Sequence, residues 1–122
     1  MTSITAQQIL DENNYTVSDI SKTHLEYLID NAINYVNLET GNSMSNMSGP
    51  AESKTVSVTS NQAAVVKPLI ALLLRAYLDR GPNVAVGGLT VTTLLGDPQF
   101  ALFKDMVDKG MNQLRGRSFV ST

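Results

Sequence analysis

The stretch Val65-Val-Lys-Pro-Leu-Ile-Ala-Leu-Leu-Leu-Arg-Ala-Tyr-Leu78 decides the fold, because it is apolar at nearly every position. Thr59 and Gln62 just before it have the spacing of a capping box, which predicts a helix from Ser60. A helix that is apolar on every face must be covered on every face. The other elements of this 122-residue chain are too modest to cover it, so part of its surface is expected to meet another subunit. The alternative is a central helix in a monomeric bundle; the residues expected at a subunit interface are Leu69, Leu72, Leu73 and Tyr77.

Proline and glycine residues mark the boundaries of this helix. Pro68 lacks an N–H, so it is expected to kink the helix or to mark its first turn. Gly81 followed by Pro82 is typical of a helix end. Beyond it, residues 84–93 alternate between apolar and other side chains around a Gly-Gly pair, which predicts a hairpin or a short strand with a bulge.

The C-terminal part predicts one more helix. Asp97 and Pro98 form its start, with an acidic N-cap and a proline in the first turn. Gly110 is expected to weaken the middle of this helix. One apolar face continues through Phe100, Phe103, Met106 or Val107, Met111 and Leu114.

Two helices and a strand are predicted before Ser60. A continuous apolar stripe at helical spacing predicts a helix over about 22–40, with Gly41 just past its end. Thr23 and Glu26 form a capping-box pair for this helix, and Ser21 with His24 is a weaker alternative start. The stripe consists of Leu25, Leu28, Ile29, Ala32, Ile33 and Val36.

The remaining N-terminal segments are shorter. Residues 4–13 predict a short helix with Thr5 as N-cap, with Ile9 and Leu10 turned inward and a break at Asn13-Asn14. The strict alternation of residues 55–59 predicts a short strand, which is a candidate partner for the 84–93 segment.

Small polar residues dominate from Gly41 to Glu52, and such residues bury too little apolar area to offset the entropy of ordering the backbone. Residues 41–54 are therefore expected to form a flexible loop, either a tolerated surface insertion or a segment that orders against a partner. Together these elements predict a mainly α fold, a bundle of three to four helices with a small β-hairpin or two-stranded element. The single domain is expected over 1–114, followed by a C-terminal tail over 115–122.

Composition argues against most enzymes. The chain has no Cys and one His, which leaves neither thiolate chemistry nor a multi-histidine metal site. His24 is interpreted as a capping or surface residue, and the carboxylate pairs Asp11/Glu12 and Asp105/Asp108 as solvated, the second pair alternating with Lys104 and Lys109. We therefore expect no catalytic residue, no cofactor and no metal. A net charge of −2 and the lack of a basic stripe argue against nucleic-acid recognition.

Targeting signals are not recognisable in the sequence. The first residues lack the basic and apolar regions of a secretory signal, and the longest apolar run is too short for a membrane span. The chain is thus expected to be soluble, made in a reducing cytoplasm and free of membrane contacts.

Charge is distributed unevenly along the chain. Residues 1–60 carry two lysines against seven acids, a net charge of −5, whereas residues 61–122 carry seven basic residues against four acids, a net charge of +3. The halves can attract each other within one fold, or across a head-to-tail interface that closes into a ring. The sequence leaves both open.

Several features occur in an order that resembles a known family. They are the capped helix Thr23–Thr40 followed by Gly41, the polar loop, the hydrophobic helix Val65–Arg80, and the glycine-bearing segment Val86–Thr92, before a final helix with an Arg-containing tail. From about Ser18 to Arg115 the chain is similar to the small head–tail connector (adaptor, or head-completion) proteins of long-tailed double-stranded DNA bacteriophages.

This resemblance implies a virion protein of the neck, made in the host cytoplasm. It implies a homo-oligomeric ring, of twelve copies in such proteins, that docks beneath the portal protein, extends the DNA channel and receives a downstream connector, stopper or tail protein, with DNA only as passing cargo. It also implies a portal-binding C-terminal segment, here Arg115, Arg117, Phe119 and Val120, with the arginines as carboxylate partners and Phe119 as an anchor. The other readings are another small tail-completion or virion protein, or a helical interaction module that acts as a monomer or dimer.

Overall fold

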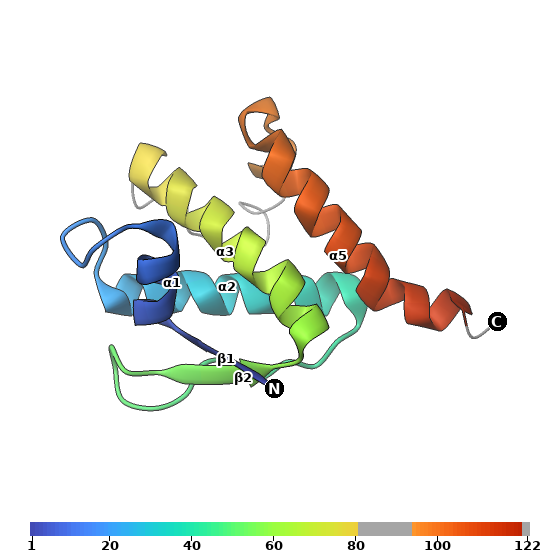
Figure 1. Ribbon diagram of the computed structural model, residues 1–122, viewed down its shortest axis with the longest axis horizontal. Helices are drawn as coiled ribbons and strands as arrows, with labels where there is room; N and C mark the ends of the chain where they lie inside the picture. Colours follow the sequence, from blue (N-terminus) through green and yellow to red (C-terminus); the bar gives the residue numbers. More distant parts are fainter. Residues whose placement is uncertain (81–93, 121–122) are drawn as a thin grey trace.

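Helix α3 lies between two other helices and above a small sheet in the computed structural model, which describes residues 1–80 and 94–120 (Figure 1). It packs against α2 on one side and α5 on the other, and α1 covers one end of α2. This arrangement confirms the predicted class, a mainly helical bundle with a two-stranded element. The elements in chain order are β1 (Thr2–Thr5), α1 (Ala6–Asn13), α2 (Lys22–Thr40), β2 (Thr55–Val58), α3 (Ser60–Arg80), the 3₁₀ turn η2 (Pro98–Phe100) and α5 (Ala101–Val120).

Side-chain caps set the start of the first two helices. At α1, Thr5 accepts a hydrogen bond from the backbone N–H of Gln8 at 3.1 Å, which confirms the predicted cap. At α2, the Ser21 hydroxyl accepts from the N–H of His24 at 3.2 Å. The predicted capping box at Thr23 is therefore wrong, and the Ser21 alternative is confirmed.

The same two helices each end at a residue with left-handed backbone conformation. Asn14 ends α1 with φ of 62°, and Gly41 ends α2 with φ of 73°. Glycine adopts this conformation without the steric cost that a Cβ imposes, which explains why α2 stops where the sequence predicted.

A reciprocal capping box starts α3. The N–H of Thr59 donates to the Gln62 side chain at 2.9 Å, and the N–H of Gln62 donates to the Thr59 hydroxyl at 3.1 Å, as predicted. Pro68 lies inside the helix rather than in its first turn, so that alternative is wrong.

The small sheet pairs β2 with the N-terminal strand β1. The strands are antiparallel, with Ile4 opposite Val56 and Thr2 opposite Val58. Ile4, Val56 and Val58 point into the core, since each is at most 5% exposed. The sequence predicted β2 but missed β1, and the segment proposed as its partner, 84–93, lies outside the described residues.

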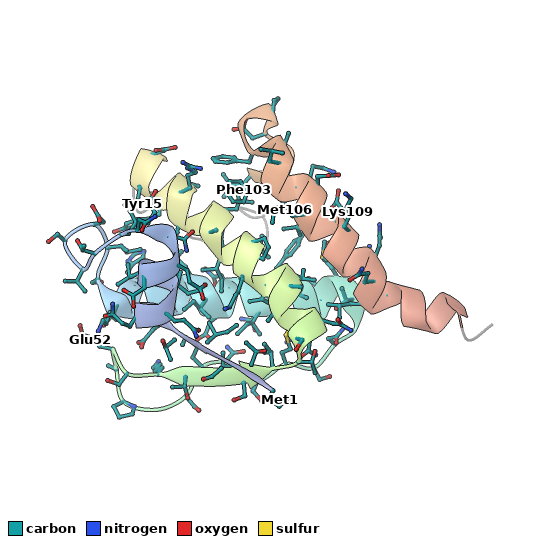
Figure 2. The ribbon with its side chains drawn as sticks, viewed as in Figure 1. Met1, Tyr15, Glu52, Phe103, Met106 and Lys109 are labelled. Carbon is teal, nitrogen blue, oxygen red and sulfur yellow. The ribbon has the colours of Figure 1, made fainter. Side chains whose placement is uncertain are left out.

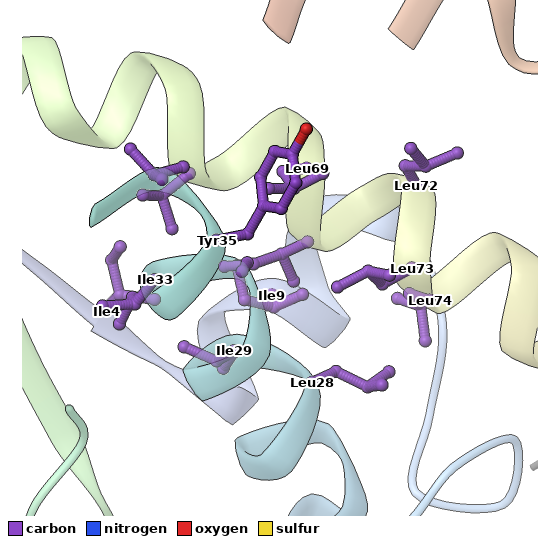
Figure 3. Packing of buried hydrophobic residues seen from close by; sticks show 14 of the residues in the cluster. Ile4, Ile9, Leu28, Ile29, Ile33, Tyr35, Leu69, Leu72, Leu73 and Leu74 are labelled. Atoms are coloured by element: carbon purple, nitrogen blue, oxygen red, sulfur yellow. The ribbon is translucent and has the colours of Figure 1, made fainter. Parts of the chain in front are cut away.

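One hydrophobic core joins all these elements. Figure 3 shows Leu73 and Leu74 on the side of α3 that faces Leu28 of α2, and Leu72 on the other side of α3. The loop before β2 contributes Met44 and Met47, which are 8% and 6% exposed. The largest fully buried side chains are Phe100, Ile4, Ile9, Leu10, Leu25, Leu28, Ile29, Ile33, Leu69, Ile70, Leu72 and Leu73.

Polar side chains along one edge of α2 hold the 41–54 segment. Asn37 donates to the carbonyl of Met44 and accepts from its N–H, both at 2.9 Å. Asp30 accepts from the N–H of Met47 at 2.8 Å, and the buried Glu26 accepts from the N–H groups of residues 52 and 54 at 3.0 and 2.9 Å. The expectation of a flexible loop that buries too little apolar area is corrected: Met44 and Met47 anchor it in the core, and side chains of α2 bond to its backbone at four residues.

Helix α5 approaches α3 closely at a glycine. A Cβ built on Gly110 would lie 2.4 Å from Cγ2 of Val65, so no other residue fits without a shift. Gly110 therefore has a packing reason in addition to its cost in helix propensity. The start at Asp97 and Pro98 forms η2, and the regular helix begins at Ala101. The helix continues to Val120, so the boundary expected at residue 114 falls inside it.

Candidate functional site

The predicted subunit interface lies in the core of the chain itself. Leu69, Leu72 and Leu73 are 0%, 0% and 1% exposed, because α2 covers one side of α3 and α5 covers the other. These three assignments are wrong for a surface that another copy must reach. Tyr77 is half-buried and its ring lies 4.6 Å from that of His24, centroid to centroid.

The predicted portal-binding segment begins with an intramolecular contact. Arg115 donates from Nε to the carbonyl of Glu39 at 2.9 Å, and its Nη2 lies 4.0 Å from the Glu39 carboxylate. Arg115 therefore already binds the end of α2 within the same chain, and a partner would compete with this contact. The helix backbone continues through Arg117 and Phe119 to Val120, whose side chains lie outside the described residues.

Opposite charges of the two halves meet inside one chain. Lys67 of α3 lies 3.1 Å from Glu12 of α1, and Arg115 of α5 reaches Glu39 of α2. At these two places the structure shows attraction within the fold. Both pairs are partly exposed, so each contributes little to stability.

The outer face of α5 carries two exposed apolar side chains. Leu102 is 81% exposed and Met106 is 52% exposed, and their i, i+4 spacing places them on one face. We call them the α5 outer pair. The sequence left Met106 or Val107 as the inward residue, and the structure selects Val107, which is fully buried. Figure 2 shows Met106 and Lys109 along this helix.

Charged residues surround the outer pair. Lys104 lies 2.6 Å from Asp108, and Lys109 lies 3.6 Å from Asp105, which confirms the predicted ion pairing on this face. The hydrogen bond to Asp108 and its negative charge raise the pKa of Lys104 above the ordinary value of 10.5. The face is therefore a small apolar spot within a balanced charged surface.

A polar cleft of about 260 Å³ opens where α1, α3 and α5 converge. The end of α1 and the turn after it contribute Glu12, Asn13, Asn14 and Tyr15. From α3 come Ala71 and Arg75, and from α5 comes Phe103. Tyr15 and Phe103 are labelled at the upper part of the molecule in Figure 2.

The titratable groups considered for catalysis have structural partners. The N–H of His24 is capped by Ser21, and its ring packs against Tyr77, with Nε2 buried and without a hydrogen bond. Asp11 accepts from Gln7 at 2.9 Å, and Glu12 pairs with Lys67.

The described ranges 1–80 and 94–120 were also compared with the needs of a metal site and of a membrane span. In these ranges no three His, Asp or Glu side chains gather closely enough to hold a metal ion. Within the same ranges no helix combines the length and hydropathy that crossing a bilayer requires.

Comparison with known proteins found no match among family models, curated proteins or solved structures.

Sequence reasoning missed the features that now stand out on the surface. The α5 outer pair was not predicted, because apolar periodicity in a helix is normally assigned to its buried face. Leu102 and Met106 nevertheless form a second, shorter i, i+4 pattern. The cleft is lined by residues more than fifty positions apart, and no local sequence pattern predicts that they come together. The hydrogen bonds from α2 to the 41–54 segment could have been predicted in part, since Glu26, Asp30 and Asn37 share one edge of the predicted helix.

Proposed function

We propose that this chain is a structural protein of the phage neck, a head–tail connector that forms a ring beneath the portal, extends the DNA channel and joins capsid to tail. The observation that carries the proposal is helix α5, which extends past the body of the bundle and bears the exposed Leu102 and Met106 (Figure 1). Isolated exposed apolar residues are common, but a pair on a projecting helix is a feature of protein contact surfaces. The resemblance over residues 18–115 supplies the kind of assembly.

In this proposal the ring closes on a surface other than the leucines of α3. The buried leucines of α3 are not available for such a contact, because the same chain encloses them. Among the described exposed apolar side chains, Leu102 and Met106 lie one turn apart on one face of α5, so we propose the copy-to-copy contact at the α5 outer pair. Fully burying a leucine or methionine side chain contributes about 1.5–3 kcal/mol each, which favours a weak contact that assembles only on a platform.

The partners follow from the same proposal. The portal protein would receive the end of α5 with Arg115, Arg117, Phe119 and Val120, and the opposite side of the ring would receive a downstream connector, stopper or tail protein. DNA would pass through the channel without sequence recognition, and an acidic N-terminal half lining it would repel the phosphates. In this proposal no reaction is catalysed, no cofactor is bound, and the chain is made in the host cytoplasm and ends in the virion.

Native mass spectrometry with and without the purified portal ring of the same phage tests the proposal. We expect a single copy or small species alone, and a ring, of about twelve copies if the resemblance holds, once the portal is present. The double variant Leu102→Ser/Met106→Ser should lose the ring but keep its helical circular dichroism. The matched control is Leu38→Ser, which changes an 80% exposed leucine on α2.

A second variant tests the portal contact. Deleting residues 118–122 should weaken portal binding while the fold remains intact, because the deleted residues lie beyond the last described core contact. Unchanged binding would remove this segment from the contact. A protein that stays single-copy on the portal would overturn the connector as a whole.

One observation favours an alternative function. A chain that encloses its own α3 is complete as a monomer, so a different tail-completion or virion protein, or a monomeric or dimeric helical interaction module, fits the same fold. The mass-spectrometry experiment separates the two, since only the connector gains copies on the portal.

A further inference from the structure

We propose that the cleft between α1, α3 and α5 binds a carboxylate-bearing segment of a partner protein, an acidic residue next to an apolar one. This inference does not rest on ring assembly and can be true of a monomer. Its basis is the combination of a cavity, a cation without a partner among the described residues, and aromatic side chains in the polar lining.

Arg75 is the cation of this cleft. Within the part of the chain that the structure describes, no acid pairs with its guanidinium and no hydrogen bond engages it. The acid in the lining, Glu12, is already paired with Lys67 at 3.1 Å. A guanidinium binds a carboxylate through two parallel hydrogen bonds, which is the strongest pairing open to an uncompensated arginine.

The polar lining offers further hydrogen bonds. The side-chain amide of Asn13 donates to the carbonyl of Ile9 at 2.8 Å, which leaves its oxygen free as an acceptor. Asn14 is exposed and its side chain forms no hydrogen bond to the described residues, so its amide C=O and NH₂ are open to a ligand. Amides of this kind match the N–H and C=O groups of a peptide backbone, which a simple inorganic anion would leave unused.

Three less polar residues in the otherwise polar lining indicate what accompanies the carboxylate. Phe103, Tyr15 and the methyl group of Ala71 line the cleft beside Arg75 and are all half-buried. An aromatic wall next to a cation suits a short apolar side chain adjacent to the acid. A cavity of about 260 Å³ is smaller than typical cofactor sites but sufficient for one or two residues of a peptide.

The lining holds the cleft in place. Asn14 is fixed in a left-handed conformation that ends α1, and the N–H of Tyr15 donates to the carbonyl of Leu10 at 3.0 Å. Ala71 and Arg75 are one turn apart on α3, whose inner side is part of the core. A preformed site avoids the ordering cost of a loop that closes on its ligand.

The test is an amide-shift titration of the ¹⁵N-labelled full chain with the peptide acetyl-Leu-Glu-amide. We expect saturable shifts confined to Asn13, Asn14, Tyr15 and Arg75, with a dissociation constant of the order of 1–10 mM for so small a probe. Acetyl-Leu-Gln-amide, which lacks only the charge, should bind at least about tenfold more weakly. Sodium acetate tests a free small carboxylate as the source, and it should also bind at least about tenfold more weakly than the peptide.

Two variants complete the design. Arg75→Gln should abolish the shifts, and this exposed position allows the change without loss of the fold. Lys109→Gln removes an exposed cation on the far side of α5 and should leave the titration unchanged. Equal binding of the Glu and Gln peptides, wild-type binding by Arg75→Gln, or no saturable shift would each overturn the proposal, and acetate binding as tightly as the peptide would overturn its peptide part.

Discussion

Helices α3 and α5 have 21 and 20 residues, but the chain covers them to very different extents. Leu72 of α3 is fully buried, because α2 and α5 lie on opposite sides of that helix. Leu102 of α5 is 81% exposed, because the described helices that pack against α5 leave this face uncovered. Position within the bundle, rather than the apolar content of a helix, thus decides which surface remains for a partner.

The largest expected effect is a core truncation in α3. Leu72→Ala removes a buried side chain and leaves a cavity, so we expect the free energy of unfolding to fall by about 3 kcal/mol. Urea unfolding followed by circular dichroism measures this change. The control Leu102→Ala on α5 should change stability by less than about 0.5 kcal/mol. Similar losses at both positions would contradict the contrast between the two helices.

The contact between α3 and α5 is tested at Gly110. Gly110→Ala improves helix propensity but drives a methyl group against Val65, and we expect a net loss of about 2 kcal/mol. In the Val65→Ala background the same change should cost less, because the collision with Cγ2 is removed and the tight contact with Cβ at 3.3 Å remains. A double-mutant cycle in urea measures the coupling, and additive effects would show that the two helices do not meet there.

Much of the helical fold could be predicted from local patterns. The stripe of α2 and the capping box at Thr59 depend on residues three or four positions apart, which lie together as soon as the helix forms. The end of α2 at Gly41 also follows from one residue, since few others adopt its positive φ without strain.

Long-range contacts set the features that the sequence did not reveal. Strand β1 has only four residues and pairs with β2, which lies fifty or more positions away in the sequence. The 41–54 segment reads as polar, but Met44 and Met47 enter the core where α2 accepts its backbone N–H groups. Coverage of α3 was misjudged for the same reason, because a sequence does not state which elements lie on both sides of a helix.

The hydrogen bonds from α2 to the 41–54 segment belong to the well-covered side of the molecule, and removing them is expected to have the next largest effect on stability. Glu26→Ala removes the acceptor for the N–H groups of residues 52 and 54, and water replaces part of what is lost. We expect a loss of about 1.5 kcal/mol and faster amide hydrogen exchange over residues 42–55. Glu39→Ala, on the exposed end of the same helix, is the control and should leave that exchange unchanged. Unchanged exchange in Glu26→Ala would contradict this role of Glu26 and would support the original expectation of a flexible loop.

The smallest expected effect lies on the exposed face of α5. The hydrogen bond from Lys104 to Asp108, together with the negative charge of that residue, raises the pKa of Lys104 above 10.5, so folding favours the protonated amine. This contribution is fully present below pH 10.5 and is lost as the pH rises through the raised pKa of the folded state. Asp108→Asn should return the pKa of Lys104 toward 10.5, as measured by NMR titration of its ε-carbon. Asp105→Asn is the matched control, since Asp105 acts on Lys104 only through space, and it should lower that pKa less. A pKa of Lys104 that is the same in Asp108→Asn as in the wild type would show that the ion pair is not formed in solution, which would leave the surroundings of the α5 outer pair free to bind charges of a partner.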